Sequence, residues 1–322
     1  MSYETAEQAA FFLLENNERN KEKTIPAIAF FGGEPLLQYD NIIKPLITKF
    51  KDKFSWSITT NGTLLTEEII DFLAENNVSI LLSWDGIKEV QDIQRPLVTG
   101  ESSFDKIIEN IHYLLLKCPE TLCRMTITKL GIPHIFETLL MWERYGVKKC
   151  AFCINEDEEY FEKDFNLMKD EFEKCALYIY KKLLKGESPI IITPFNTLYS
   201  TIKEGDYEPY FHNEFTRCGM GTTSIGISYD GTLNPCQEEN STKKFAIGDI
   251  WTGIDKDKHK DYLNKYFNIM DNLHCEKNCP SSIRYICFNS LCPNSIIQDN
   301  GNISDAKCLY HRAMYYAVGR LY

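Results

Sequence analysis

The chain has 322 residues, of which 43% are hydrophobic and 25% charged, a composition typical of a globular protein that buries a sizeable core. Its formal net charge of −11 argues against a general nucleic-acid-binding surface and against docking on an anionic membrane. The sequence has no apolar stretch long enough to span a bilayer and no secretory signal at its N-terminus, so we expect a cytoplasmic protein.

Helix and strand patterns alternate through the first part of the chain, after an amphipathic helix predicted over residues 4–18. The predicted strands cover 25–31, 54–60, 78–84, 123–129 and 148–155. The predicted helices cover 39–52, 66–77, 103–117, 133–146 and roughly 158–184, with Thr66 and Ser103 as N-caps. Strands that are apolar on both faces and separated by helices predict a parallel α/β sheet or barrel.

Unusual residues follow three of these strands. The segment "AFFGGEPLL" is followed in the chain by "TTNG" and "SWDG" at the next two strand ends, and the residues concerned are Gly32, Gly33, Glu34, Pro35, Thr60, Asn61, Gly62, Ser83, Asp85 and Gly86. Because the carboxyl ends of parallel strands meet at one edge, we expect these residues to line one mouth. Asn61-Gly62 and Asp85-Gly86 are also common turn residues. A Gly-Gly pair followed by an acid is not needed to end a strand, and it lets another molecule approach the backbone closely.

The cysteines gather after this alternation stops, and we place a domain boundary between residues 186 and 212. Seven of the twelve cysteines lie in the last 105 residues: Cys218, Cys236, Cys275, Cys279, Cys287, Cys292 and Cys308. In a reducing compartment such cysteines are more often metal ligands or redox groups than disulfides, and an odd number does not close a disulfide framework. The segment "TSIGISYDGTLNPC" predicts a β-hairpin that brings Cys218 and Cys236 near each other.

Two kinds of metal centre compete for these cysteines. A structural zinc ion takes four ligands and prefers closely spaced cysteine pairs, so seven cysteines fill one site and leave three over. Iron–sulfur clusters accept more varied spacings, and one cluster with four thiolates plus one with three uses all seven. The spacing therefore favours iron–sulfur clusters over zinc, with inert or disulfide-bonded cysteines as the third alternative.

The motifs together resemble a known family. "GGEP", "TTNGTLLT" and "LLSWDG" look like the strand-end motifs of radical S-adenosylmethionine (radical SAM) enzymes, and the resemblance covers nearly the whole chain. The tail resembles the SPASM domain of that family: twelve residues separate Cys218 from Gly231, four more precede Cys236, and a four-cysteine run and a closing cysteine follow. The spacings within the run are each longer than those common in the family.

The resemblance implies roles for individual residues. Gly32, Gly33 and Glu34 would contact the amino group of S-adenosylmethionine, and Pro35 would shape their loop. Asn61 and Ser83 would face the same cofactor, and Arg95 in "QDIQRP" would lie near its carboxylate, unless it is a surface charge. One auxiliary [4Fe-4S] cluster would be held by Cys275, Cys279, Cys287 and Cys308. The other would be held by Cys218, Cys236 and Cys292, with a fourth site that is open or filled by another residue. Gln237 follows Cys236, so the general-base role that some relatives give to an acid there does not transfer.

The family's CxxxCxxC motif, whose three thiolates hold the catalytic cluster, does not occur in this sequence. Cys150 and Cys153 form a pair, but on a different predicted strand and without a third cysteine nearby, so we interpret them as strand residues. We expect either that the first strand and its cluster loop are cut off or encoded upstream, or that this is a short form without radical chemistry.

The resemblance implies a partial (β/α)6 barrel over residues 1–200 and a SPASM iron–sulfur domain over residues 201–322. It implies a maturase of a ribosomally made peptide or protein that forms a thioether or similar cross-link, through reductive cofactor cleavage and hydrogen abstraction by a 5′-deoxyadenosyl radical. A flavodoxin or ferredoxin would supply electrons. The alternatives are an anaerobic sulfatase-maturing enzyme, a non-catalytic iron–sulfur electron-transfer or peptide-binding protein, and a zinc-stabilised binding module.

Overall fold

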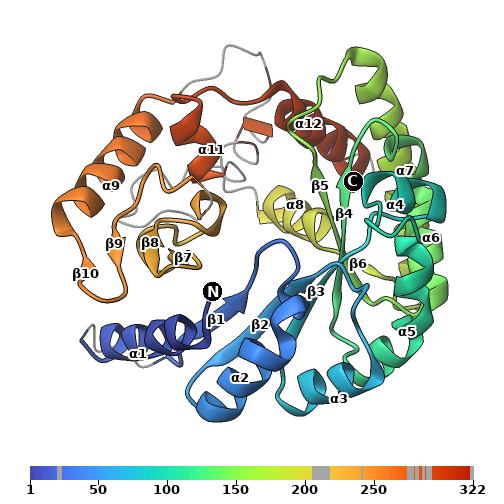
Figure 1. Ribbon diagram of the computed structural model, residues 1–322. Helices are drawn as coiled ribbons and strands as arrows, with labels where there is room; N and C mark the ends of the chain where they lie inside the picture. Colours follow the sequence, from blue (N-terminus) through green and yellow to red (C-terminus); the bar gives the residue numbers. More distant parts are fainter. Residues whose placement is uncertain are drawn as a thin grey trace.

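The computed structural model describes residues 1–19, 24–204, 218–240, 242–273, 279, 283, 284, 287 and 292–319. Its main feature is a parallel sheet of six strands in the order β1-β2-β3-β4-β5-β6, an α/β fold as predicted (Figure 1). The strands of this sheet are β1 (Ala27–Phe30), β2 (Ser55–Thr60), β3 (Ser79–Ser83), β4 (Leu122–Ile127), β5 (Lys149–Ile154) and β6 (Ile191–Ile192). Their carboxyl ends lie at one edge, because every neighbouring pair runs parallel.

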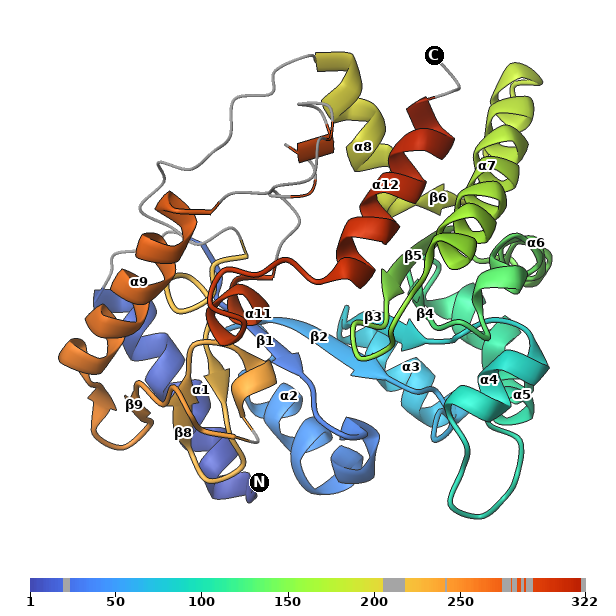
Figure 2. The same cartoon turned by 90° about the horizontal axis from the view of Figure 1, so that it is seen from above.

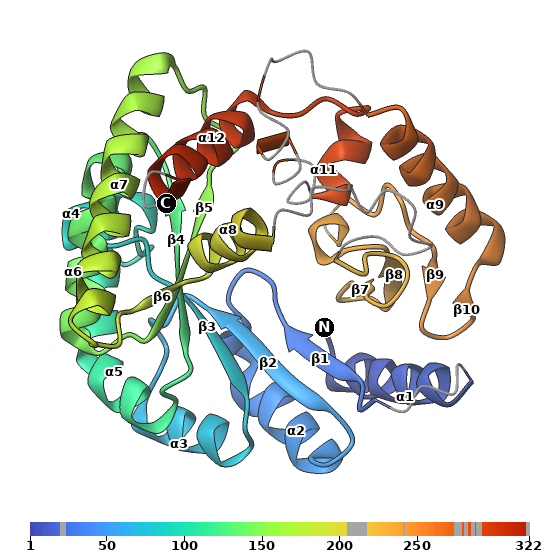
Figure 3. The same cartoon turned by 180° about the vertical axis from the view of Figure 1, so that it is seen from behind.

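Helices follow the strands and cover the convex face of the sheet, as Figures 1 and 3 show for α2, α3, α5 and α6. The helices of this part are α1 (Tyr3–Arg19), α2 (Lys44–Phe50), α3 (Glu67–Glu75), α4 (Lys88–Gln94), α5 (Ser103–Lys117), α6 (Ile135–Tyr145), α7 (Glu162–Leu184) and α8 (Thr193–Glu204). Strand side chains that face these helices, such as Ile58, Leu82 and Phe152, are buried, and their alternate neighbours are more exposed. The residues that the structure describes therefore cover the opposite, concave face only in part.

The C-terminal part builds a second, antiparallel sheet in the order β10-β9-β8-β7. Its elements are β7 (Gly226–Ile227), β8 (Thr232–Asn234), β9 (Gly248–Asp249), β10 (Gly253–Ile254), and the helices α9 (Lys256–Asp271), α11 (Pro293–Gln298) and α12 (Asp305–Gly319). The hairpin predicted after Cys218 is confirmed: Ile227 of β7 pairs with Leu233 of β8, and Asp230 accepts a hydrogen bond from Thr232 N at 3.2 Å in the turn.

Two hydrophobic cores hold the chain, and each contains residues from both ends of the sequence. Ala313 and Met314 of α12 belong to the core of the parallel sheet, where α12 packs against α7, α8 and β5 (Figure 2). Ala9 and Phe12 of α1 belong to the core of the C-terminal part. The division at residue 200 stays a prediction, and these contacts cross it.

Most predicted elements of the first part are confirmed within a few residues, including the N-cap Thr66, whose Oγ1 accepts from Ile69 N at 3.3 Å. Ser103 was the wrong N-cap. Ser102 caps α5 by accepting from Asp105 N at 3.0 Å, and Ser103 is a buried first residue of the helix. The helices α4 and α8, the strand β6 and the C-terminal helices were not predicted. No helix among the described residues is long and apolar enough to cross a membrane.

Candidate functional site

Glu34 joins the carboxyl ends of β1 and β2. Its Oε1 accepts hydrogen bonds from Thr60 Oγ1 at 2.8 Å and Leu36 N at 3.0 Å, and its Oε2 accepts one from Asn61 N at 2.7 Å. The carboxylate thus fixes the loop after β1 onto the end of the next strand. Its predicted contact with the amino group of a cofactor stays a prediction, and three of its acceptor positions are already engaged by the chain.

The two glycines before Glu34 leave open space in front of their backbone. Gly32 has a φ of +148°, a conformation that side chains rarely adopt, and a Cβ at Gly32 or Gly33 would meet no heavy atom within 4 Å. A bound molecule can therefore approach the backbone of Gly32 and Gly33 closely. Asn61 is partly a turn residue, because its Oδ1 accepts from Thr63 N at 2.9 Å and from Thr63 Oγ1 at 2.7 Å.

An ion pair joins the ends of β3 and β4. Asp85, which is 1% exposed, accepts from Arg95 Nε at 2.6 Å and Arg95 Nη2 at 3.2 Å, and from Thr126 N at 2.9 Å. This two-pronged geometry is the strong form of a carboxylate–guanidinium contact. Arg95 is thus not a solvated surface charge. Its predicted position beside a cofactor carboxylate stays a prediction, since two of its nitrogens hold Asp85; Ser83 is buried at the end of β3 beside this pair.

Cys218, Cys236 and Cys292 gather beside Tyr262 of α9 and form no disulfide. Burial, followed by the nearby Cys292 and Cys218, raises the pKa of the Cys236 thiol to about 11. The hairpin brings the first two cysteines together, since Gly221 N donates to Pro235 O at 3.0 Å. Tyr262 is buried and donates to Met220 Sδ at 3.1 Å. The three cysteines of this predicted set therefore lie within electrostatic reach of one another.

Three cysteines of the second predicted set meet at another place. Cys279, Cys287 and Cys308 line one small pocket together with His311 and three further residues, Ile283, Arg284 and Arg312. Cys275 lies outside the described residues. Across the part of the chain that the structure describes, no group of three or more cysteine, histidine or acidic side chains is arranged to hold a metal ion. The assignment of these cysteines as cluster ligands stays a prediction.

Helix α12 positions Cys308 through contacts with β5 and the loop after it. Tyr310 is buried and its hydroxyl donates to Phe152 O at 2.6 Å. Lys307 pairs with Glu156 at 2.7 Å. Burial, aided by the charge of Lys307, lowers the pKa of His311 to about 4.

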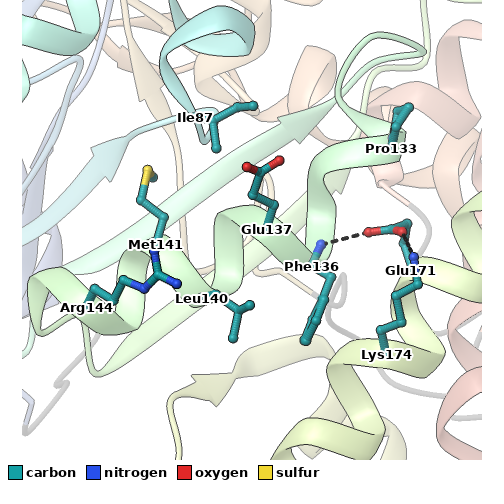
Figure 4. Close-up of a pocket in the computed structure, with 9 residues that line it drawn as sticks. All are labelled: Ile87, Pro133, Phe136, Glu137, Leu140, Met141, Arg144, Glu171 and Lys174. Atoms are coloured by element: carbon teal, nitrogen blue, oxygen red, sulfur yellow. Dashed lines mark hydrogen bonds and ion pairs between the residues drawn. The ribbon is translucent and has the colours of Figure 1, made fainter.

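Residues of α6 and α7 line a cavity of about 460 Å³ in the outer helical layer, and Figure 4 shows their side chains. Glu171 of α7 closes one side of it: this carboxylate is buried, accepts from Phe136 N at 3.0 Å and pairs with Lys174. These contacts satisfy a backbone donor in the first turn of α6, a structural role. The cavity lies on the other side of the sheet from the partly exposed concave face.

Sequence reasoning missed the partners of the predicted residues rather than the residues themselves. Asp85 was noted only as a strand-end residue, and neither Tyr262 nor His311 was considered. The tail pattern offered a signal for His311, since it lies three positions after Cys308, one helical turn away. Tyr262 carried no such signal.

The comparisons with known proteins agree with this geometry. Residues 13–136 match the family model of the radical SAM superfamily. The chain is 28% identical over 245 residues to an uncharacterized protein of Methanocaldococcus jannaschii, covering 73% of this chain and 79% of that protein. It is 28% identical over 224 residues to the cysteine-type anaerobic sulfatase-maturating enzyme of Clostridium novyi, covering 65% of this chain and 58% of that enzyme.

A solved structure resembles the chain over its full length. The structure of native anSMEcpe with bound AdoMet and the Cp18Cys peptide has a TM-score of 0.74 at 23% identity, and the match covers 100% of this chain and 90% of that one. This likeness shows a common fold, which confirms the predicted radical-SAM-type α/β architecture.

Proposed function

We propose that this chain supplies the S-adenosylmethionine-binding sheet and the auxiliary clusters of a radical SAM maturase that modifies a peptide or protein. The CxxxCxxC motif of the catalytic cluster does not occur in its sequence, so the ligands of that cluster would have to come from elsewhere. The observation that carries the proposal is the open Gly32-Gly33 backbone at the carboxyl edge of a radical-SAM-type sheet, combined with two separate groups of cysteines in the tail. The relatives named above support it, since one is a maturating enzyme and one solved structure contains a peptide.

S-adenosylmethionine fits the residues at the carboxyl edge of the sheet. The glycine backbone leaves room for its amino end, and Glu34 holds that loop in place through Thr60 and Asn61. Ser83 and the Asp85–Arg95 pair would line the neighbouring strand ends. When bound beside a reduced iron–sulfur cluster, this cofactor supplies the hydrogen-abstracting chemistry of the family, and the chain binds and orients it.

Two iron–sulfur clusters fit the cysteine groups by the chemistry of their donors. Cys275, Cys279, Cys287 and Cys308 would hold one cluster, and Cys218, Cys236 and Cys292 the other. Arg284 and Arg312 line the pocket of the first group, and their positive charges would offset the negative charge of thiolate ligands. These clusters would pass electrons between the substrate and a flavodoxin or ferredoxin.

The substrate we favour is a ribosomally made peptide or a protein in which a thioether or similar cross-link is formed, in the cytoplasm. The similarity to the Clostridium novyi enzyme favours sulfatase maturation as the second candidate. The two differ in substrate and product, because the first joins side chains of a peptide through a new cross-link and the second acts on a sulfatase. Mass and fragmentation of a treated peptide would separate them.

The test is the metal content of the chain purified and reconstituted without oxygen. Two four-iron clusters predict about eight irons per chain with matching sulfide, and about twelve would indicate a third cluster. Cys308→Ala should lower the iron content by about four per chain, whereas the control Cys118→Ala, a half-buried cysteine of the first part, should leave it unchanged. Zinc without iron would contradict the proposal, and eight irons without cofactor cleavage would favour a non-catalytic iron–sulfur protein.

A further inference from the structure

Arg124 lies on the concave face of the main sheet. Along β4 the side chains of Cys123, Met125 and Ile127 are fully buried against the helices, and Leu122, Arg124 and Thr126 alternate with them on the other face. The strand pairing sets Arg124 opposite Ser83 on one side and Ala151 on the other. A charged side chain in the middle of a parallel strand is uncommon and calls for a partner.

The chain itself supplies no such partner among the residues that the structure describes. The Nε atom of Arg124 is buried and donates no hydrogen bond. Within the described ranges no carboxylate pairs with this guanidinium, whereas Arg95, one strand connection earlier, is held by Asp85. Its strand neighbours Ser83 and Ala151 are neutral, so neither of them balances the charge.

On the β5 side, the surface near Arg124 is open to solvent. Cys153, opposite Thr126 on β5, is exposed. Surrounding protein nonetheless raises the pKa of its thiol, while the charge of Arg124 acts in the opposite direction. A side chain such as Cys153 that is exposed to solvent and still surrounded by protein is expected on a concave surface. A ligand on the concave face can therefore reach the guanidinium.

We propose that Arg124 binds a carboxylate of the molecule that occupies the concave face of the sheet. A guanidinium offers parallel N–H donors that match a carboxylate in two-pronged geometry. Two cations, Arg124 and Lys307, act on Cys153. Lys307 is already paired with Glu156, so Arg124 is the cation left for a ligand, and one carboxylate balances its charge. The proposal rests on the proposed function, which supplies two sources of this group: an acidic residue of the peptide substrate, and the carboxylate of the cofactor.

Two pairs of probes distinguish these sources by equilibrium dialysis against the full chain, purified without oxygen. S-adenosylhomocysteine carries the cofactor's carboxylate and 5′-methylthioadenosine lacks it. The capped peptide acetyl-Ala-Glu-Ala-amide carries a carboxylate and its glutamine counterpart lacks it. Arg124→Gln should lower the affinity for the carboxylate-bearing member of one pair about ten- to hundredfold and leave the affinity for its neutral partner unchanged. Arg124→Lys, which keeps the charge without the planar fork, should fall between.

The matched control is Arg144→Gln, which removes an exposed arginine from the outer face of α6. It should change none of the four affinities. Equal affinities of wild type and Arg124→Gln for both carboxylate probes would overturn the proposal, as would equal weakening of charged and neutral probes. Binding of 5′-methylthioadenosine to the wild type reports on the proposed function separately, because that probe has no carboxylate. If none of the four probes binds, both proposals fail.

Discussion

Replacing Asp85 with asparagine tests whether the ion pair with Arg95 fixes the ends of β3 and β4. Asp85 is 1% exposed, and its carboxylate accepts from Arg95 Nε at 2.6 Å and from Thr126 N at 2.9 Å. Asparagine keeps the size and one acceptor oxygen, which can still serve Thr126 N. It removes the negative charge, so the guanidinium is left beside a neutral amide.

The size of the effect follows from how far each partner is buried. Removing one member of a fully buried ion pair costs about 3–5 kcal/mol. The Arg95 side chain is 30% exposed, so water recovers part of this energy. We therefore expect Asp85→Asn to lower the free energy of unfolding by about 2 kcal/mol. As a control, Asp105→Asn removes the exposed pair with Lys88 and should cost at most about 0.5 kcal/mol.

Urea unfolding followed by tryptophan fluorescence is a suitable assay, because the buried Trp84 adjoins Asp85 in the chain. Asp85→Asn, Arg95→Gln and the double variant complete a thermodynamic cycle. A direct pair predicts a coupling energy of about 1–2 kcal/mol, and a value below about 0.3 kcal/mol would refute the reasoning. A second readout is the amide of Thr126, which should exchange faster with solvent in the Asp85→Asn variant.

Three further predictions concern the loop after β1 and helix α12. Glu34→Gln places an amide donor against Thr60 Oγ1 or a backbone N–H, so it should lower the local stability by about 1–3 kcal/mol and speed hydrogen exchange at Asn61. Unchanged exchange at Asn61 would contradict the inference that Glu34 fixes the loop after β1 to the end of β2. Tyr310→Phe removes the 2.6 Å hydrogen bond to Phe152 O and should lower the free energy of unfolding by about 1–2 kcal/mol, measured by urea titration, whereas an unchanged value would mean that the bond adds no net stability. The pKa of His311 is about 4 when folded and near 6.5 when unfolded, so the unfolded chain binds the proton first: the stability is present above about pH 6.5 and is lost as the pH falls toward 4. His311→Phe should flatten urea midpoints measured across that window, and an equally steep dependence in the variant would assign it to other groups.

The strands of the main sheet could be predicted because each one is marked by a pattern in its own short stretch of sequence. Apolar runs such as 54–60 and 78–84 alternate with helical patterns, and each run needs only its own residues to be recognised. β6 escaped notice because it is a two-residue strand, Ile191–Ile192, too short to show a pattern. The choice between Ser102 and Ser103 as the N-cap of α5 also lies beyond local sequence, since both are good caps. The folded chain decides it, because Ser102 Oγ accepts from Asp105 N at 3.0 Å and Ser103 is buried in the first turn of the helix.

The candidate site shows the same contrast. The position of "GGEP" after a strand was readable, and so was the hairpin that joins Cys218 to Cys236. What Glu34 and Arg95 bind was not readable, because their partners come from other strand ends and the choice depends on the folded geometry. Arg124 illustrates the limit best: it stands inside a predicted strand, and only the pairing of β4 with its neighbours shows which face the side chain takes.

The exchange of helices between the two cores has a consequence for how the protein can be divided. α12 completes the core of the parallel sheet, and α1 contributes Ala9 and Phe12 to the other core. A fragment ending at Glu204 would expose the apolar surface that α12 covers, and a fragment starting after it would lose the α1 residues. The two halves are therefore obligate folding partners. We expect one cooperative unfolding transition, with damage in either core transmitted to the cysteine groups of the tail.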